Sequence, residues 1–77
     1  MAELEKDPAE DKELSLIKQI ARTSFRISAR FTAVDNDEVR LSLNTALTIL
    51  SQALLIVKDD SKYARRLFEL AKKIGRI

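Results

Sequence analysis

Apolar side chains recur about every 3.6 residues in three blocks of this chain, a spacing that predicts three helices. We expect the first helix from about residue 8 to residue 33, with Pro8 at its first helical position and Asp7 as its cap. The second helix should run to about residue 58, and the third should follow after a short break. One Gly and one Pro in 77 residues leave little material for hairpins. The pattern therefore predicts an all-α protein.

Polar residues at the two breaks supply start signals for the second and third helices. Asp35 and Glu38 have the spacing of a capping box, in which two side chains bond the first free backbone N–H groups of a helix. Asp60 or Ser61 can cap the third helix. Gly75 is the expected end of that helix, because glycine commonly stops a helix.

Short breaks between long helices place consecutive helices antiparallel, so the sequence predicts an up-down-up three-helix bundle. Residues 8–77 form one domain in this interpretation, and residues 1–7 form a flexible acidic leader. A helix-turn-helix reader of the major groove fits less well, because that motif uses short helices around a tight turn.

The composition argues against catalysis. The chain has no Cys and no His, which removes disulfides, thiolate chemistry and the usual zinc sites. Its acids cluster at helix starts, where capping accounts for them, and no Gly-rich phosphate loop is present. We expect no catalytic residue, metal or cofactor. The acidic N-terminus does not resemble a signal peptide, and no apolar run approaches the ~20 residues of a membrane span, so we expect a cytoplasmic protein.

Positive charge is concentrated after the first 13 residues, which carry six acids and two lysines. The other 64 residues carry twelve basic and six acidic side chains. A cation recurs at every fourth position from Lys18 to Arg30, and no acid occurs from residue 14 to residue 34. Such cations align along one helix as a ridge that suits phosphates. An ordinary solvated face, or neutralisation by the acidic leader, would explain the same pattern.

The third helix repeats this arrangement, with basic residues on its outer face. Cations near its C-terminus also suit the helix dipole. Together the two ridges predict contacts with the phosphates of RNA or DNA. The residues predicted to make them are Lys18, Arg22, Arg26, Arg30, Arg65, Arg66 and Lys73.

Apolar positions predict which faces point inward. On the first helix these are Leu16, Ile17, Ile20, Ala21, Ser24, Ile27, Ser28 and Phe31. On the third they are Tyr63, Ala64, Leu67, Leu70, Ala71 and Ile74, with Phe68 at the margin. The four aromatic side chains, Phe25 among them, are expected to fill the core rather than to stack on bases.

The second helix carries no charge between Arg40 and Lys58. After its core stripe is assigned, four large aliphatic residues remain on the opposite side, which is costly for a monomer in water. One explanation is that both neighbouring helices cover it. The interpretation that we favour is a protein interface, most simply in a homodimer. Its predicted residues are Leu41, Thr45, Thr48, Ile49, Gln52, Leu55 and Ile56.

The segment YARRLFELAKKI, residues 63–74, resembles the second helix of the zinc-ribbon protein subunit of archaeal ribonuclease P. The resemblance covers about residues 43–77. It implies a helical hairpin of the kind that in that family contacts a partner subunit and the RNA. The cysteines of the ribbon and the basic segment that follows it are absent from this sequence.

Two functions follow as hypotheses. The first is a non-catalytic nucleic-acid-binding protein that uses the ridges on the first and third helices. The alternative is a protein-interaction module, a homodimer or an adaptor subunit, that uses the uncharged face of the second helix. Attachment to a membrane surface ranks below both, because the apolar face of the first helix is needed for the core.

Overall fold

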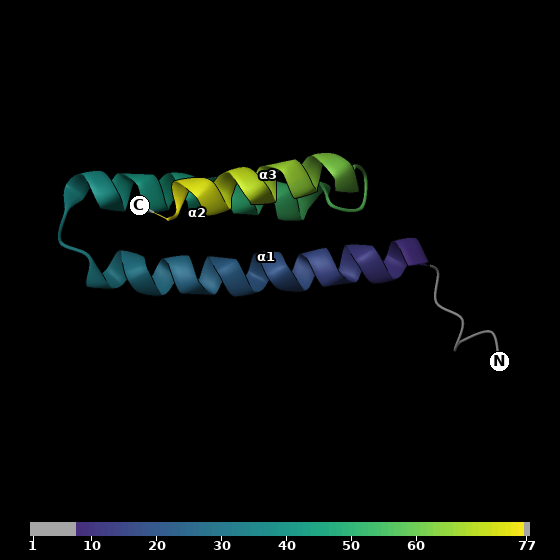
Figure 1. Ribbon diagram of the computed structural model, residues 1–77, viewed down its shortest axis with the longest axis horizontal. Coiled ribbons are helices and arrows are strands. Elements are labelled where there is room, and N and C mark those ends of the chain that lie inside the picture. Colours follow the sequence, from purple (N-terminus) through teal and green to yellow (C-terminus); the bar gives the residue numbers. More distant parts are fainter. Residues whose placement is uncertain (1–7, 77) are drawn as a thin grey trace.

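The computed structural model describes residues 8–76, and side chains from residue 12 onward. Its three helices are α1 (Pro8–Ala33), α2 (Asp37–Ile56) and α3 (Ser61–Ile74), and residues 8–76 contain no strand. Figure 1 shows α1 and α3 running in the same direction and α2 running against both. The predicted all-helical class and the order of three packed helices are confirmed. The predicted acidic leader, residues 1–7, lies outside the described residues.

Short polar side chains begin α2 and α3. Asn36 caps α2, because its Oδ1 accepts the backbone N–H groups of Glu38 at 2.9 Å and Val39 at 3.2 Å. The prediction that Asp35 is the cap was therefore wrong by one residue. Asp60 caps α3 and accepts the N–H of Tyr63 at 3.0 Å, as the sequence allowed.

The two helix ends also differ in detail from the prediction. α2 stops at Ile56, two residues early, since the N–H groups of Asp59 and Asp60 both turn back to its carbonyl. Gly75 caps α3 with φ −75° and ψ −4°, which any residue can adopt. Glycine matters there for space instead: a Cβ would lie 2.9 Å from Ile27 Cδ1 of α1. The end of α3 thus packs closely on α1.

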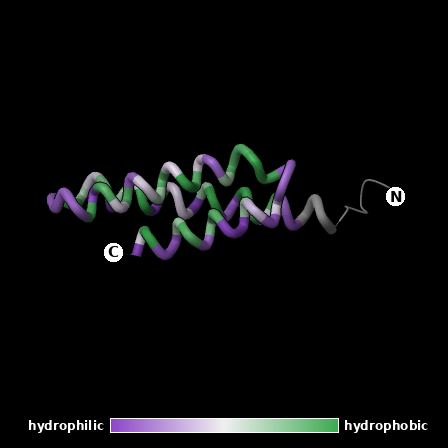
Figure 2. Tube along the Cα trace, turned by 90° about the horizontal axis from the view of Figure 1, so that it is seen from above, coloured by the Kyte–Doolittle hydropathy of each residue, from purple (hydrophilic) through white to green (hydrophobic). Residues whose placement is uncertain are grey.

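α2 lies at the centre of the packing. It contacts both α1 and α3, and these two contact each other least. Four fully buried alanines, Ala46 and Ala53 on α2 with Ala64 and Ala71 on α3, allow close approach of these two helices. The remaining core side chains are Leu16, Ile20 and Ile27 of α1, Leu43 and Leu50 of α2, Val57 just after α2, and Phe68 of α3. Figure 2 shows the apolar end of α2 leading into the polar turn before α3.

The inward faces of α1 and α3 differ from the prediction. Phe68, expected at the margin, is 2% exposed, whereas Tyr63 and Leu70 are about half exposed. Phe68 lies on the same side of α3 as the fully buried Ala64 and Ala71, so the inward face of this helix is rotated from the predicted one. On α1, Ala21 and Ser28 are exposed, and so is Phe25 at 78%. The expectation that all four aromatic residues fill the core was wrong for Phe25 and Tyr63.

The outer side of α2 is partly covered. Ile49 and Ile56 pack against the core, while Leu41 and Leu55 remain exposed. The interpretation that neighbouring helices cover α2 therefore holds for two of these four residues. By length and composition alone, α2 is also apolar enough to cross a membrane, a test that core helices pass too.

Candidate nucleic-acid interface

The limited contact between α1 and α3 leaves a groove between them, hollowed at three successive places. Because the two helices run parallel, residues near the start of α1 face the start of α3, and the same holds at their ends. We call this surface the basic groove. The cations that line it are Lys12, Arg22, Arg26 and Arg30 on α1, Lys62, Arg65 and Lys72 on α3, and Arg76 just beyond α3.

The α1 wall follows from the four-residue spacing of its cations. Each step of four residues turns the side chain by about 40° around the helix. Lys18 therefore stands on the solvent side of α1, whereas Arg22 and Arg26 line the groove. Arg30, one step further, reaches α3 and donates a hydrogen bond from Nη1 to the carbonyl of Gly75. Arg30 thus also caps the end of α3.

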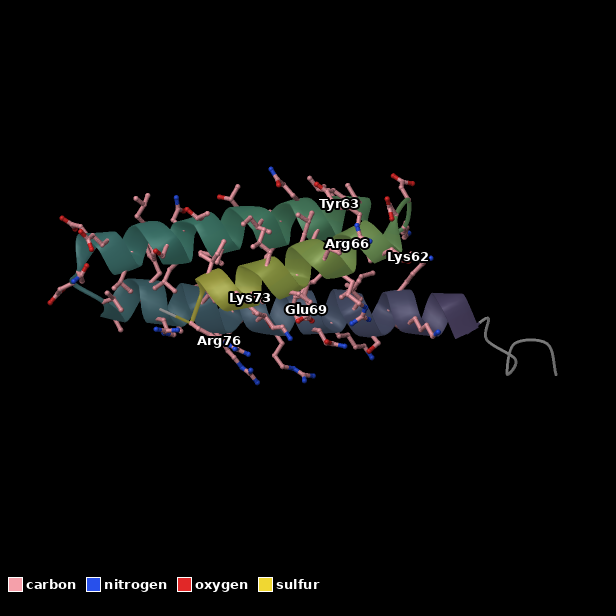
Figure 3. All side chains as sticks on the ribbon, turned by 45° about the horizontal axis from the view of Figure 1, so that its top comes forward. Lys62, Tyr63, Arg66, Glu69, Lys73 and Arg76 are labelled. Carbon is pink, nitrogen blue, oxygen red and sulfur yellow. The ribbon has the colours of Figure 1, made fainter. Side chains whose placement is uncertain are left out.

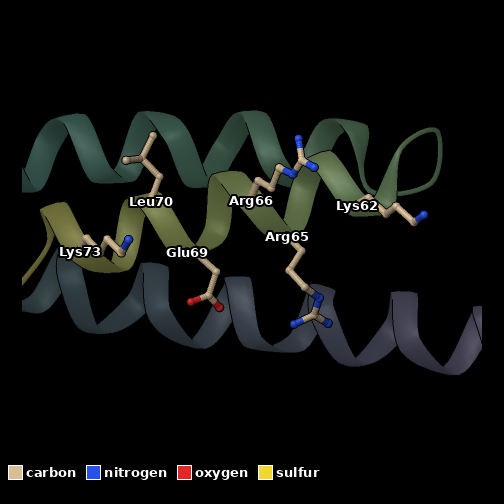
Figure 4. Close-up of a pocket in the computed structure, with 6 residues that line it drawn as sticks. All are labelled: Lys62, Arg65, Arg66, Glu69, Leu70 and Lys73. Atoms are coloured by element: carbon tan, nitrogen blue, oxygen red, sulfur yellow. The ribbon is translucent and has the colours of Figure 1, made fainter.

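The cations of α3 divide into two rows. Arg65, Lys72 and Arg76 recur at steps of seven and four residues and line the groove. Arg66 and Lys73 belong to a shallow hollow on the outer face of α3. Figure 4 shows Arg65 pointing towards α1 and Arg66 towards α2.

The two sides of α3 are also distinct in a view of all side chains. Tyr63 lies on the side of α2, whereas Arg76 lies on the side of α1 (Figure 3). Lys62 and Arg65 border both the groove and the outer hollow, because they stand near the start of α3 where the two surfaces meet.

Acidic residues contribute little to the groove. Among the side chains described from residue 12 onward, no Asp or Glu lines its three hollows. The nearest acid, Glu69, forms an ion pair with Lys72 at 3.2 Å, and both groups are solvent-accessible. An exposed pair of this kind is weak, so most of the positive potential along the groove remains.

The structure brings together four of the seven cations predicted to bind nucleic acid: Arg22, Arg26, Arg30 and Arg65. It places Lys18, Arg66 and Lys73 on other surfaces. Sequence reasoning missed the groove-lining residues Lys12, Lys62, Lys72 and Arg76.

Lys72 and Arg76 follow Arg65 at steps of seven and four residues, a spacing that places all three on one side of a helix. This spacing could have identified Lys72 and Arg76 as partners of Arg65. The helix dipole had seemed a sufficient reason for cations in the last turn of α3. Lys12 and Lys62 offered no such signal, because only the parallel packing of α1 and α3 brings them to one groove.

A second surface is mainly apolar, although the charged residues Glu13, Lys18 and Lys58 lie on it or beside it. Leu14 lines a hollow with Ile17 of α1 and Lys58 beyond α2, so this side of α1 borders α2. Phe25, about three turns later, lies on the same side. We call this surface the neutral face. We include in it the exposed apolar residues Leu14 and Phe25 of α1 and Leu41, Leu54 and Leu55 of α2, of which Leu41 and Leu55 lie on the side of α2 opposite its core.

Polar residues of the predicted α2 interface are satisfied within their own helix. Thr45 donates its hydroxyl to the carbonyl of Leu41 at 3.0 Å, and Thr48 donates to that of Asn44 at 3.1 Å. Both threonines and Gln52 are exposed. Because the hydroxyl protons are engaged internally, this face offers fewer donors than its sequence suggests.

The interior offers no chemistry among the described residues. Their core contains no polar or charged side chain, and no group of three or more acids forms a metal site. Comparison of the chain with known protein families, with curated proteins and with solved structures finds no match. Any function must therefore be argued from the basic groove and the neutral face.

Proposed function

We propose that this protein binds nucleic acid through phosphate contacts in the basic groove. The observation that carries the proposal is the meeting of cations from α1 and α3 on the two walls of one groove, with no carboxylate among the described side chains that line it. The resemblance of residues 43–77 to a ribonuclease P hairpin, which stays a prediction, points in the same direction.

Electrostatics explains why a polyanion suits this groove. Like charges four residues apart on one helix repel by a few tenths of a kcal/mol per pair. In this fold the cations of α3 add to those of α1, and the exposed Glu69 offsets only part of the repulsion. A strand of phosphates would relieve it, and would release the counterions that both partners hold. Guanidinium groups, which predominate in the groove, suit phosphate geometry.

The test compares two double variants of equal charge. Arg22→Gln/Arg26→Gln removes two groove cations, and Arg66→Gln/Lys73→Gln removes two cations from the outer face of α3. Binding to a labelled oligonucleotide is titrated between about 50 and 200 mM salt. Each lost phosphate contact lowers the slope of log K against log salt by roughly 0.7 to 0.9. We expect the groove variant to lose about 1.4 to 1.8, and the outer variant clearly less.

Equal losses in the two variants would show that net charge, and not the groove, governs binding. Absence of salt-dependent binding by the unaltered protein would refute the proposal. Far-ultraviolet circular dichroism serves as the folding control, because Gln preserves helix propensity at all four positions.

A second candidate function, protein association through the neutral face, is favoured by the exposure of Leu55 at 81% and Phe25 at 78%. Its simplest form is a homodimer, in which two basic chains meet on their uncharged surfaces. We expect Leu55→Glu to shift the protein towards monomer in sedimentation velocity, because association would bury a charge without a partner. A protein that is monomeric at high concentration before the substitution would contradict this candidate.

A further inference from the structure

We infer that the basic groove holds one strand of nucleic acid by its sugar-phosphate backbone, with the bases directed away from the protein, so that the bases contribute almost nothing to affinity. This inference rests on the proposed function and deepens it, since it specifies which part of the ligand is recognised. Three features of the groove support it: the aromatic residues, the neutral polar residues and the spacing of the cations.

The groove presents no aromatic surface on which a base could stack. Proteins that bind the bases of single strands use exposed aromatic rings for this purpose. Phe68 borders the groove but is buried, and the ammonium of Lys72 lies 4.8 Å from the centroid of its ring. The two most exposed aromatic residues, Phe25 and Tyr63, lie on other surfaces: Phe25 on the neutral face and Tyr63 on the side of α2.

The groove also has few groups that could read base edges. Base-specific contacts need side chains with both donors and acceptors, such as Gln and Asn. Gln19 is the amide that lines the groove, and its Nε2 donates to Ser15 Oγ at 3.2 Å on the same helix. The other neutral polar side chains of its lining are Thr23 and Ser61, which offer a single hydroxyl each. Cations therefore dominate the recognition chemistry.

The spacing of the cations matches a repeating anion. Arg22 and Arg26, and likewise Lys72 and Arg76, are one helical turn apart, which is about 6 Å along the axis. Pairs of cations with this spacing on the two walls suit neighbouring phosphates of an extended strand, and the wider gaps between pairs leave phosphates without a direct partner. From Lys62 to Arg76 the α3 wall extends about 21 Å, enough for roughly four to six nucleotides.

The experiment compares a fluorescein-labelled ten-residue oligothymidylate with an abasic phosphodiester strand of the same length and backbone. Fluorescence anisotropy at low salt measures both dissociation constants. We expect the two values to agree within about threefold, because loss of even one stacked base costs roughly fivefold to more than a hundredfold. Arg22→Gln/Arg26→Gln should weaken both strands by the same factor, and Arg66→Gln/Lys73→Gln should weaken both by less.

The other outcomes separate the two proposals. If oligothymidylate binds and the abasic strand is more than about fivefold weaker, the inference on the backbone is overturned while the proposed function survives. If neither strand binds, the proposed function fails and the inference fails with it. If both bind and the groove variant binds as well as the outer variant, the strand lies elsewhere, and the inference is again overturned.

Discussion

The two exposed sides of α1 come from the same 26 residues and have opposite character. The side that faces α3 presents Arg22, Arg26 and Arg30 to the basic groove. The side that borders α2 presents Leu14 and Phe25, and one exposed cation, Lys18, lies between them. Each side is completed by a different neighbour: α3 adds cations to the first, and α2 adds exposed leucines to the second.

The difference shows how a small three-helix protein can carry two unrelated surfaces. A helix needs only part of its circumference for the core, so two flanks remain for other purposes. Repulsion between like charges disfavours contact of the basic flank with a second copy of this basic chain, whereas the mainly apolar flank has less of this cost. Positive charge is thus distributed unevenly around α1.

The largest expected effect tests whether the neutral face is truly separate from the core. Leu50 is fully buried and Leu55 is 81% exposed on the same helix. Leu50→Ala should lower the free energy of unfolding by about 2–5 kcal/mol, because it leaves a cavity between helices. Leu55→Ala should change it by less than about 0.5 kcal/mol. Urea denaturation measures both free energies. A large loss of stability in Leu55→Ala would show that Leu55 contributes to the fold and is not only a surface residue.

A smaller expected effect on stability distinguishes Arg30, which also has a structural role, from the other cations on the basic side of α1. Arg30→Gln removes the hydrogen bond to the Gly75 carbonyl and should destabilise the protein by about 1 kcal/mol. Arg26→Gln should be neutral or slightly stabilising, because repulsion along the ridge falls. Thermal denaturation of the two variants compares them at equal net charge. Equal melting temperatures would show that the end of α3 does not depend on Arg30.

The smallest effect concerns the close approach of α1 and α3 at the end of the groove. Gly75→Ala places a Cβ 2.9 Å from Ile27 Cδ1 and 3.2 Å from the carbonyl oxygen of Ala71. We expect a loss of up to about 1 kcal/mol, since the clash outweighs the entropy that Ala removes from the unfolded chain.

The matched background is Ile27→Val, which lacks the Cδ1 atom. In that background Gly75→Ala should be less destabilising than in the unaltered protein, and a double-mutant cycle of unfolding free energies gives the coupling. Strictly additive effects would show that the cost of Gly75→Ala does not come from contact with Ile27.

Much of the fold could be predicted from local signals. The bounds of α1 followed from Pro8 and from the break after Ala33, and Asp60 was among the two caps expected for α3. Asn36 was missed because Asp35 forms the more familiar capping-box spacing with Glu38. Helix existence and order depend on contacts within a few residues, which a pattern along the chain records directly.

The candidate site was predictable only in part. The ridge on α1 was visible in the sequence because its members are neighbours on one helix. The distribution of cations on α3 was not, since it depends on how far that helix is rotated about its own axis. The burial of Phe68 and the exposure of Tyr63 show that the rotation differed from the apolar pattern.

The sequence by itself determined three helices, their order, the basic ridge of α1 and the uncharged stretch of α2, because each depends on residues close together in the chain. The tertiary structure decided which of these features share a surface. The rotation of α3, with Ala64, Phe68 and Ala71 inward, brings Arg65 opposite Lys12, and Lys72 and Arg76 opposite Arg26. Packing between helices is a property of two surfaces at once, and no single stretch of sequence contains it.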